Sequence, residues 1–280
     1  MKTVTIRNTT FGSGMPKICV PLAAADLKML ESQLKALNTY DLIEFRADAY
    51  TGCDEEALKL IRSVAGEKPV LFTIRTKNEG GSLEISDEDY MKRNVAAAAN
   101  ADLVDLEFSR LYPGWIMQGQ GYSEDEAQEY REDHSCAPGN DGHRTGNAVK
   151  AGEMTEQIHR AGALVIGSFH DFFRTPDASE LILRLSMLQK CGCDLTKAAV
   201  MPREKGDVLE LMFASLEMEQ TYADRPYVTM SMGEDGKITR IAGSFTGSAV
   251  TFAAAGCVSA PGQMRAELIR PVLEELAGKG

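Results

Sequence analysis

Two residues of the sequence could form a covalent catalytic pair, Lys197 and His170. Lys197 lies in the apolar segment 195–201 with no acidic residue beside it. A lysine in a poorly solvated strand has a lowered pKa, and its neutral amine can form an imine with a ketone. His170 directly follows the preceding apolar segment, 164–169, and an imidazole there could move a proton next to a carbonyl. The alternative for His170 is a core histidine with a satisfied hydrogen bond.

Other charged residues also lie inside apolar segments or at their ends. Glu44 and Arg46 are two residues apart in segment 42–46, so a strand places both on one face. Arg75 follows segment 70–74, and Asp105 lies within 103–107. Because burying a charge is costly unless it is paired or used, these positions indicate either ion pairs or a site.

The elements that must position these residues are short segments rich in β-branched residues, most of them followed by a segment with helical periodicity. This alternation predicts parallel βαβ units, and eight units of about thirty residues are typical of a (β/α)₈ barrel. We therefore predict that residues 1–280 form one such barrel with 1–14 as a β extension, while a doubly wound open sheet is the alternative. The expected strands are 17–22, 42–46, 70–74, 103–107, 164–169, 195–201, 227–231 and 249–253.

One connection is too long for an ordinary barrel loop. A helix is predicted over 153–162, which leaves residues 108–151 as an insertion after the fourth strand, on the face where barrels keep their active sites. His134, Cys136 and His143 in this insertion lack a fourth ligand and the regular spacing of a zinc site. We expect a solvated flap or an oligomer contact there and no metal.

Composition excludes several classes of protein. The net charge is −11 and no basic stripe is present, so we expect neither nucleic acid nor an anionic membrane as a partner. No apolar run is long enough to span a membrane, the N-terminus has no signal-peptide pattern, and the six cysteines are sparse. The expected location is the cytoplasm, with reduced thiols.

Seven segments together resemble the type I 3-dehydroquinate dehydratases, the Schiff-base class of the shikimate pathway. Their order and their placement at successive strand ends make the resemblance specific and nearly chain-wide. They are Glu44-Phe45-Arg46-Ala47-Asp48, Phe72-Thr73-Ile74-Arg75 with Glu79-Gly80-Gly81, Asp102-Leu103-Val104-Asp105-Leu106-Glu107, His170-Asp171-Phe172 with Thr175-Pro176, Lys197-Ala198-Ala199-Val200-Met201-Pro202, Thr229-Met230-Ser231-Met232-Gly233 and Ser259-Ala260-Pro261-Gly262-Gln263.

The resemblance implies a role for each candidate residue and no metal or organic cofactor. Lys197 would form the imine with 3-dehydroquinate, His170 would move protons, and Glu79 would orient His170. The substrate-binding residues that it implies are Arg240, Ser259 and Gln263 for the carboxylate and Glu44, Arg46 and Arg75 for the hydroxyl groups.

The resemblance further implies a homodimer. Two alternatives stay open, another Schiff-base barrel such as a class I aldolase and a non-catalytic ligand-binding barrel. The aldolase would need a phosphate site at Gly233 and Gly236, which the acid-rich segment 234–240 disfavours.

Overall fold

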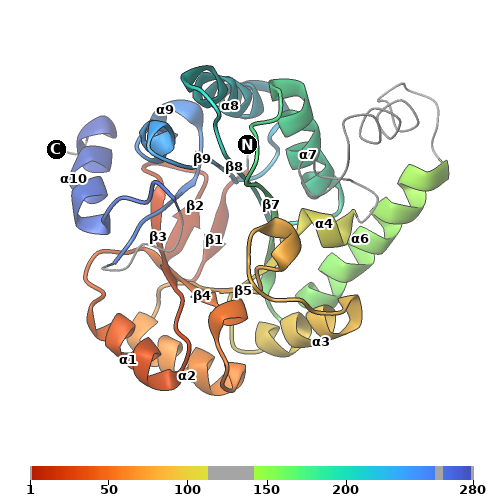
Figure 1. Ribbon diagram of the computed structural model, residues 1–280, viewed down its shortest axis with the longest axis vertical. Helices are drawn as coiled ribbons and strands as arrows, with labels where there is room; N and C mark the ends of the chain where they lie inside the picture. The colour runs from red at the N-terminus through yellow and green to blue at the C-terminus, as the bar shows by residue number, and fades with distance from the viewer. Residues whose placement is uncertain (1, 113–141, 256–260, 279–280) are drawn as a thin grey trace.

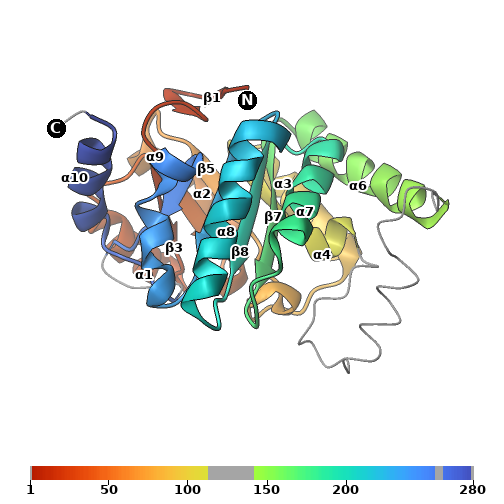
Figure 2. The same ribbon diagram turned by 90° about the horizontal axis from the view of Figure 1, so that it is seen from above.

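The computed structural model describes residues 2–112, 142–255 and 261–278, and the side chains of 142–149 are not described. Eight parallel strands form one sheet surrounded by helices, as Figures 1 and 2 show. Its strands, in spatial order, are β10 (Val250–Phe252), β3 (Lys17–Leu22), β4 (Leu42–Arg46), β5 (Val70–Thr73), β6 (Leu103–Glu107), β7 (Leu164–Asp171), β8 (Leu195–Val200) and β9 (Tyr227–Ser231).

The two ends of this strand order meet, so the sheet is a nearly closed barrel. The N–H of Ala249, just before β10, donates to the carbonyl of Tyr227 in β9 at 2.8 Å. On its other side β10 pairs with β3, with Val250 opposite Lys17. All eight predicted strands and the (β/α)₈ barrel are confirmed, and the doubly wound alternative is wrong.

Helices follow the strands and cover the outside of the barrel (Figure 1). Several begin at a side chain that accepts a hydrogen bond from the first turn, as Ser86 does from the N–H of Asp89 and Asp177 from that of Glu180. The described helices are α1 (Leu27–Lys35), α2 (Asp54–Ala65), α3 (Asp87–Ala98), α4 (Phe108–Leu111), α6 (Gly142–Ala161), α7 (Ala178–Lys190), α8 (Lys205–Glu217), α9 (Gly243–Thr246) and α10 (Ala266–Leu276).

The connection between β6 and β7 differs from the sequence expectation. Helix α6 begins at Gly142 rather than at 153, and Ala151, before the expected start, is buried. Phe108 and Tyr112, at the start of the expected insertion, are buried in the hydrophobic core. His134 and Cys136, considered as zinc ligands, lie outside the described residues, as does the side chain of His143.

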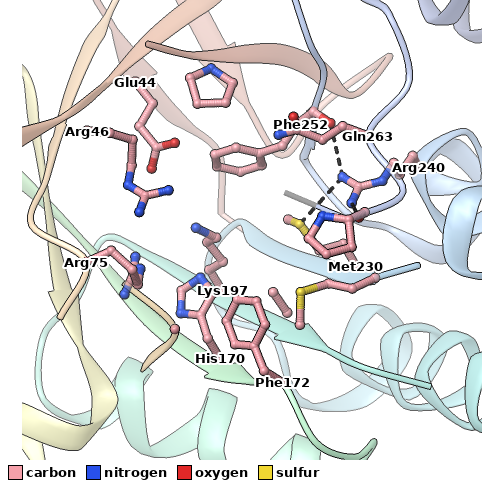
Figure 3. Close-up of a pocket in the computed structure, with 15 residues that line it drawn as sticks. Glu44, Arg46, Arg75, His170, Phe172, Lys197, Met230, Arg240, Phe252 and Gln263 are labelled. Carbon is pink, nitrogen blue, oxygen red and sulfur yellow. Dashed lines mark hydrogen bonds between the residues drawn. The ribbon is translucent and has the colours of Figure 1, made fainter. Parts of the chain in front are cut away.

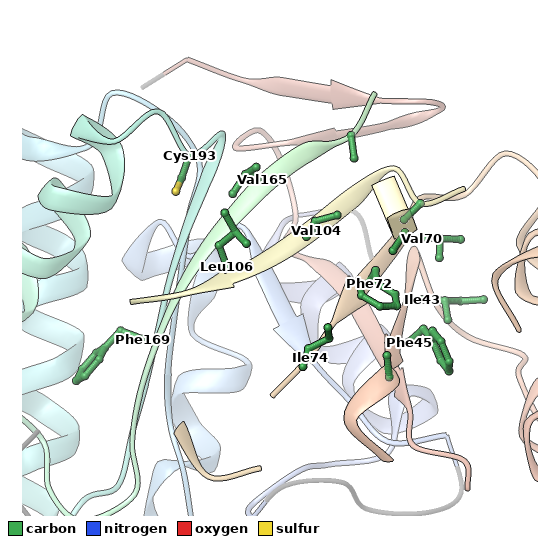
Figure 4. Packing of buried hydrophobic residues seen from close by; sticks show 14 of the residues in the cluster. Ile43, Phe45, Val70, Phe72, Ile74, Val104, Leu106, Val165, Phe169 and Cys193 are labelled. Atoms are coloured by element: carbon green, nitrogen blue, oxygen red, sulfur yellow. The ribbon is translucent and has the colours of Figure 1, made fainter. Parts of the chain in front are cut away.

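Alternate residues of each strand face opposite sides, which separates two apolar layers. One layer packs between the strands and the helices, where Phe45 and Phe72 have ring centroids 6.0 Å apart (Figure 4). The other fills the interior of the barrel near the amino-terminal ends of the strands and includes Leu42, Leu71 and Leu103.

An N-terminal hairpin closes the end of the barrel at which the strands begin. It consists of β1 (Val4–Ile6) and β2 (Thr9–Phe11), whose Ile6 and Phe11 join the interior layer. The charged residues of the strands therefore lie at the opposite end, where the strands have their carboxyl ends. Among the described helices, none is long and apolar enough to cross a membrane.

Candidate active site

A pocket of about 270 Å³ opens at the carboxyl ends of the barrel strands (Figure 3). It gathers side chains from most of the strands, as expected when the strands of a barrel end at one face. Seven of the nine predicted site residues line it, namely Glu44, Arg46, Arg75, His170, Lys197, Arg240 and Gln263. Glu79 lies behind His170, and Ser259 lies outside the described residues.

Lys197 projects from β8 into this pocket with its side chain only 5% exposed. Its Nζ lies 3.8 Å from Oδ2 of Asp105 and 4.4 Å from the centre of the Phe252 ring. Burial lowers the pKa of Lys197, and the positive charge of Arg75 lowers it further, although Asp105 and Glu44 oppose the shift. A larger fraction of Lys197 is therefore in the neutral, nucleophilic form than would be the case for an exposed lysine at the same pH.

His170 and Glu79 form a buried hydrogen-bonded pair beside Lys197. Nδ1 of His170 lies 2.8 Å from Oε2 of Glu79, and the Ser109 N–H donates to the other oxygen of Glu79 at 2.9 Å. Burial and the carboxylate of Glu107 raise the pKa of Glu79 to about 8, while burial and neighbouring cations lower that of His170 well below its usual range. When Nδ1 of His170 carries the ring proton and donates it to Glu79, the other ring nitrogen can face the pocket as a base.

Arg75 is held by acidic residues that the sequence reasoning did not assign to the site. Its Nη1 donates to Oε1 of Glu107 at 2.9 Å, and its Nη2 lies 2.8 Å from Oδ1 of Asp105. Burial alone would lower the pKa of Arg75, but these carboxylates raise it above its usual range. The sequence did mark Asp105 and Glu107 as charged residues in an apolar strand. That both bind Arg75 depends on the register between neighbouring strands, which the sequence does not show.

One donor, Thr73, and one acceptor, Asp48, fix the other two residues expected to meet hydroxyl groups. The Thr73 hydroxyl donates to Oε1 of Glu44 at 2.8 Å. Arg46 donates from Nε and Nη2 to the two oxygens of Asp48, both at 2.8 Å. Glu44 and Arg46 still line the pocket, so one acceptor and one donor are presented on the same side.

Arg240 is a buried cation of a different kind, on the far side of the pocket from Glu44 (Figure 3). Its guanidinium donates to the carbonyls of Phe252 and Pro261, each at 3.0 Å. None of the described carboxylates forms an ion pair with it, and burial lowers its pKa to about 10. Such a guanidinium suits an anionic group of a ligand, and Gln263 lines the pocket nearby.

The rest of the pocket wall is apolar, from Pro21, Phe172, Met230, Met232 and Phe252. Gly233 and Gly236, considered as a phosphate site, are absent from the lining, so the aldolase alternative gains no support. Within the described ranges no group of three or more His, Cys, Asp or Glu residues could hold a metal ion. The arrangement can bind a small hydroxylated anion and present an amine and an imidazole to it.

Comparisons with known proteins agree with this geometry. The family model described as Type I 3-dehydroquinase matches residues 18–113 and 147–279. The 3-dehydroquinate dehydratase of Syntrophotalea carbinolica is 38% identical over 285 residues, covering 99% of this chain and 98% of that protein. The 3-dehydroquinate dehydratase of Escherichia coli O1:K1 / APEC is 37% identical over 282 residues, with 98% of each chain covered.

Solved structures give the same result. The type I 3-dehydroquinate dehydratase from Clostridium difficile, a structure with covalently modified comenic acid, has a TM-score of 0.82 and 34% identity, covering 100% of this chain and 99% of that one. The 3-dehydroquinate dehydratase from Geobacillus kaustophilus has a TM-score of 0.80 and 30% identity, with 99% and 97% covered. From its sequence, its barrel and its site, the chain belongs to the type I 3-dehydroquinase family.

Proposed function

We propose that this protein dehydrates 3-dehydroquinate to 3-dehydroshikimate, a step of aromatic amino acid biosynthesis, through an imine on Lys197. The observation that carries the proposal is the buried amine of Lys197 in a pocket shared with the His170–Glu79 pair. A neutral amine and a base of this kind are what removal of a proton next to a ketone requires. The family match supplies the substrate.

The charges of the pocket suggest how the substrate is oriented. Its carboxylate would bind Arg240, with help from Gln263 and from Ser259, because Arg240 is the buried guanidinium without a described acidic partner. Its hydroxyl groups would meet Glu44 and Arg46 together with Arg75, which supply both acceptors and donors. This orientation puts the ketone toward Lys197, between the two polar sides of the pocket (Figure 3).

The reaction then follows from the residues at hand. The Lys197 amine attacks the ketone carbon, and the ketone oxygen leaves as water. The protonated imine withdraws electrons from the adjacent carbon, and His170 removes a proton from it. The resulting enamine expels the β-hydroxyl group, which leaves as a second water after taking a proton from His170. Hydrolysis of the imine consumes one water and regenerates the amine, so one water is released overall.

Glu79 acts through His170 rather than on the substrate. Its hydrogen bond to Nδ1 orients the imidazole, while burial and the charges of Arg75 and Lys197 lower the pKa of His170 and disfavour the imidazolium. A permanent imidazolium could not accept the substrate proton. Glu79 is therefore a positioning residue in this mechanism.

Borohydride reduction in the presence of 3-dehydroquinate tests the proposal. Reduction converts an imine into a stable amine but leaves a hydrogen-bonded ketone unattached, so peptide mass analysis should locate an adduct on Lys197. Lys197→Met should give neither adduct nor turnover. Lys190→Met, which removes an exposed lysine at the end of α7, is the matched control and should behave as wild type. An active, substrate-saturated enzyme with Lys197 unmodified would refute the mechanism.

We further propose that the protein is a homodimer and works in the cytoplasm, where its substrate would be made. Leu209 and Phe213 lie one turn apart on α8 and are 66% and 55% exposed, and Phe245 on α9 is 70% exposed. Clustered exposed apolar side chains of this size are typical of a protein contact. Light scattering should give the mass of two chains for wild type, and Phe213→Glu should reduce it to one chain if this face forms the contact.

A further inference from the structure

A second cavity adjoins the substrate pocket and shares Phe172, Gly80 and His170 with it. Its volume is about 280 Å³, and these three residues also line the substrate pocket. Its remaining lining comes from residues without a role in the proposed substrate binding, Lys77, Asn78, Asp171 and Phe173. His170 therefore lines both cavities.

Phe172 packs closely against Gly80 where the two cavities meet. The ring of Phe172 lies beside His170 (Figure 3), and a Cβ atom on Gly80 would come within 2.0 Å of that ring. Gly80 also has a φ of +84°, a left-handed conformation that glycine adopts most readily. On the other side, Asp171 accepts the N–H groups of Phe173 and Arg174 at 2.9 and 3.0 Å, which fixes the turn that carries Phe172.

The chemistry of the second cavity suits water better than an anionic ligand. Lys77 is its only described cation, and Nζ of Lys77 already donates to Glu84 at 2.5 Å. The carboxyl group of Asp171 in the same lining would repel an anion. The polar groups of Lys77, Asn78, Asp171 and His170 give water the several hydrogen-bonding partners that it needs.

The reaction requires water to enter and leave the site. Imine formation and elimination each expel a water, and hydrolysis takes one up, with its oxygen becoming the ketone oxygen of the product. Substrate bound in the first cavity displaces solvent from it. Resting on the function proposed above, we propose that the second cavity is a solvent chamber that exchanges water with bulk solvent beside His170 while the first cavity holds substrate.

Isotopic oxygen tests the chamber. The enzyme is mixed rapidly with unlabelled 3-dehydroquinate in ¹⁸O water for a single turnover, and released product is reduced at once with borohydride to fix its ketone oxygen. If expelled water escapes before hydrolysis, the product carries solvent oxygen. Asn78→Trp and Lys77→Trp, made separately, each enlarge a side chain that lines the chamber without replacing a proposed substrate ligand, and Asn78→Ala is the control that keeps it open.

Wild type and Asn78→Ala should give product with nearly complete solvent label. Each tryptophan variant should retain the original oxygen in at least about twofold more product, because water trapped in the site is reused. Thermal unfolding shows which variants are folded, and either folded variant suffices. A folded tryptophan variant that forms the Lys197 adduct but labels its product as wild type does would overturn the chamber. Absence of any adduct in wild type would instead overturn the proposed function.

Discussion

Replacing Arg240 with methionine separates the role of this residue in binding from its role in stability. Arg240 is 2% exposed, and its described partners are two carbonyl groups and the sulfur of Met230, with no carboxylate among them. Burial lowers its pKa from the usual range of an arginine to about 10. A buried cation without a counter-ion destabilises the folded state, and a bound carboxylate would compensate for this.

The size of the effect follows from the shift in pKa. A difference of about 2.5 units between the unfolded and folded states corresponds to about 3 kcal/mol against the folded, charged form. The cost is present throughout the range below pH 10, where Arg240 is charged in both states, and it is relieved only as the pH rises above 10 toward the pKa of an arginine in the unfolded chain. Removing the charge recovers this energy but loses two hydrogen bonds, each worth about 1 kcal/mol.

We therefore expect Arg240→Met to leave the free energy of unfolding within about 1 kcal/mol of wild type. Its KM for 3-dehydroquinate should rise about 10²-fold, because a charge-assisted contact of about 3 kcal/mol is lost. Urea unfolding and the absorbance of the conjugated product measure the two quantities. Arg160→Met, at an arginine whose side chain is 72% exposed on α6, is the control for loss of an arginine. A variant that loses about 3 kcal/mol of stability while keeping its KM would refute the reasoning.

Three other changes test other parts of the site. His170→Ala should still form the borohydride adduct while kcat falls about 10²–10⁴-fold, and Glu79→Gln should lower kcat less because Glu79 acts through the imidazole; a kcat within about threefold of wild type for His170→Ala would require another base. Asp105→Asn should shift the pH profile of imine formation to lower pH, since Asp105 raises the pKa of Lys197; a shift to higher pH would contradict that electrostatic assignment. Replacing residues 113–141 with a Gly-Ser linker should preserve the adduct while changing KM, kcat or the oligomeric state, measured by trapping, kinetics and light scattering; a folded variant that forms no imine would place a required residue in that segment.

The strands could be predicted because each is a short run of apolar residues, and burial of that run in the folded protein favours the same strand, as in segment 42–46. The candidate pocket residues could be named because charges inside such runs are rare, and the resemblance gave each a role. The shared contact of Arg75 with Asp105 and Glu107 could not be derived, since it depends on how neighbouring strands are aligned. Helix α6 was placed too short because its N-terminal half shows no clear apolar periodicity.

Closure of the barrel has a consequence for how the protein is made in the cell. The pairing of β10 with β3 joins residues from the two ends of the chain, and the N-terminal hairpin can pack its Phe11 only against an assembled interior. A chain still emerging from the ribosome therefore carries strands with unpaired edges until synthesis is nearly finished. We expect interrupted or truncated synthesis to yield aggregation-prone fragments rather than partly active enzyme.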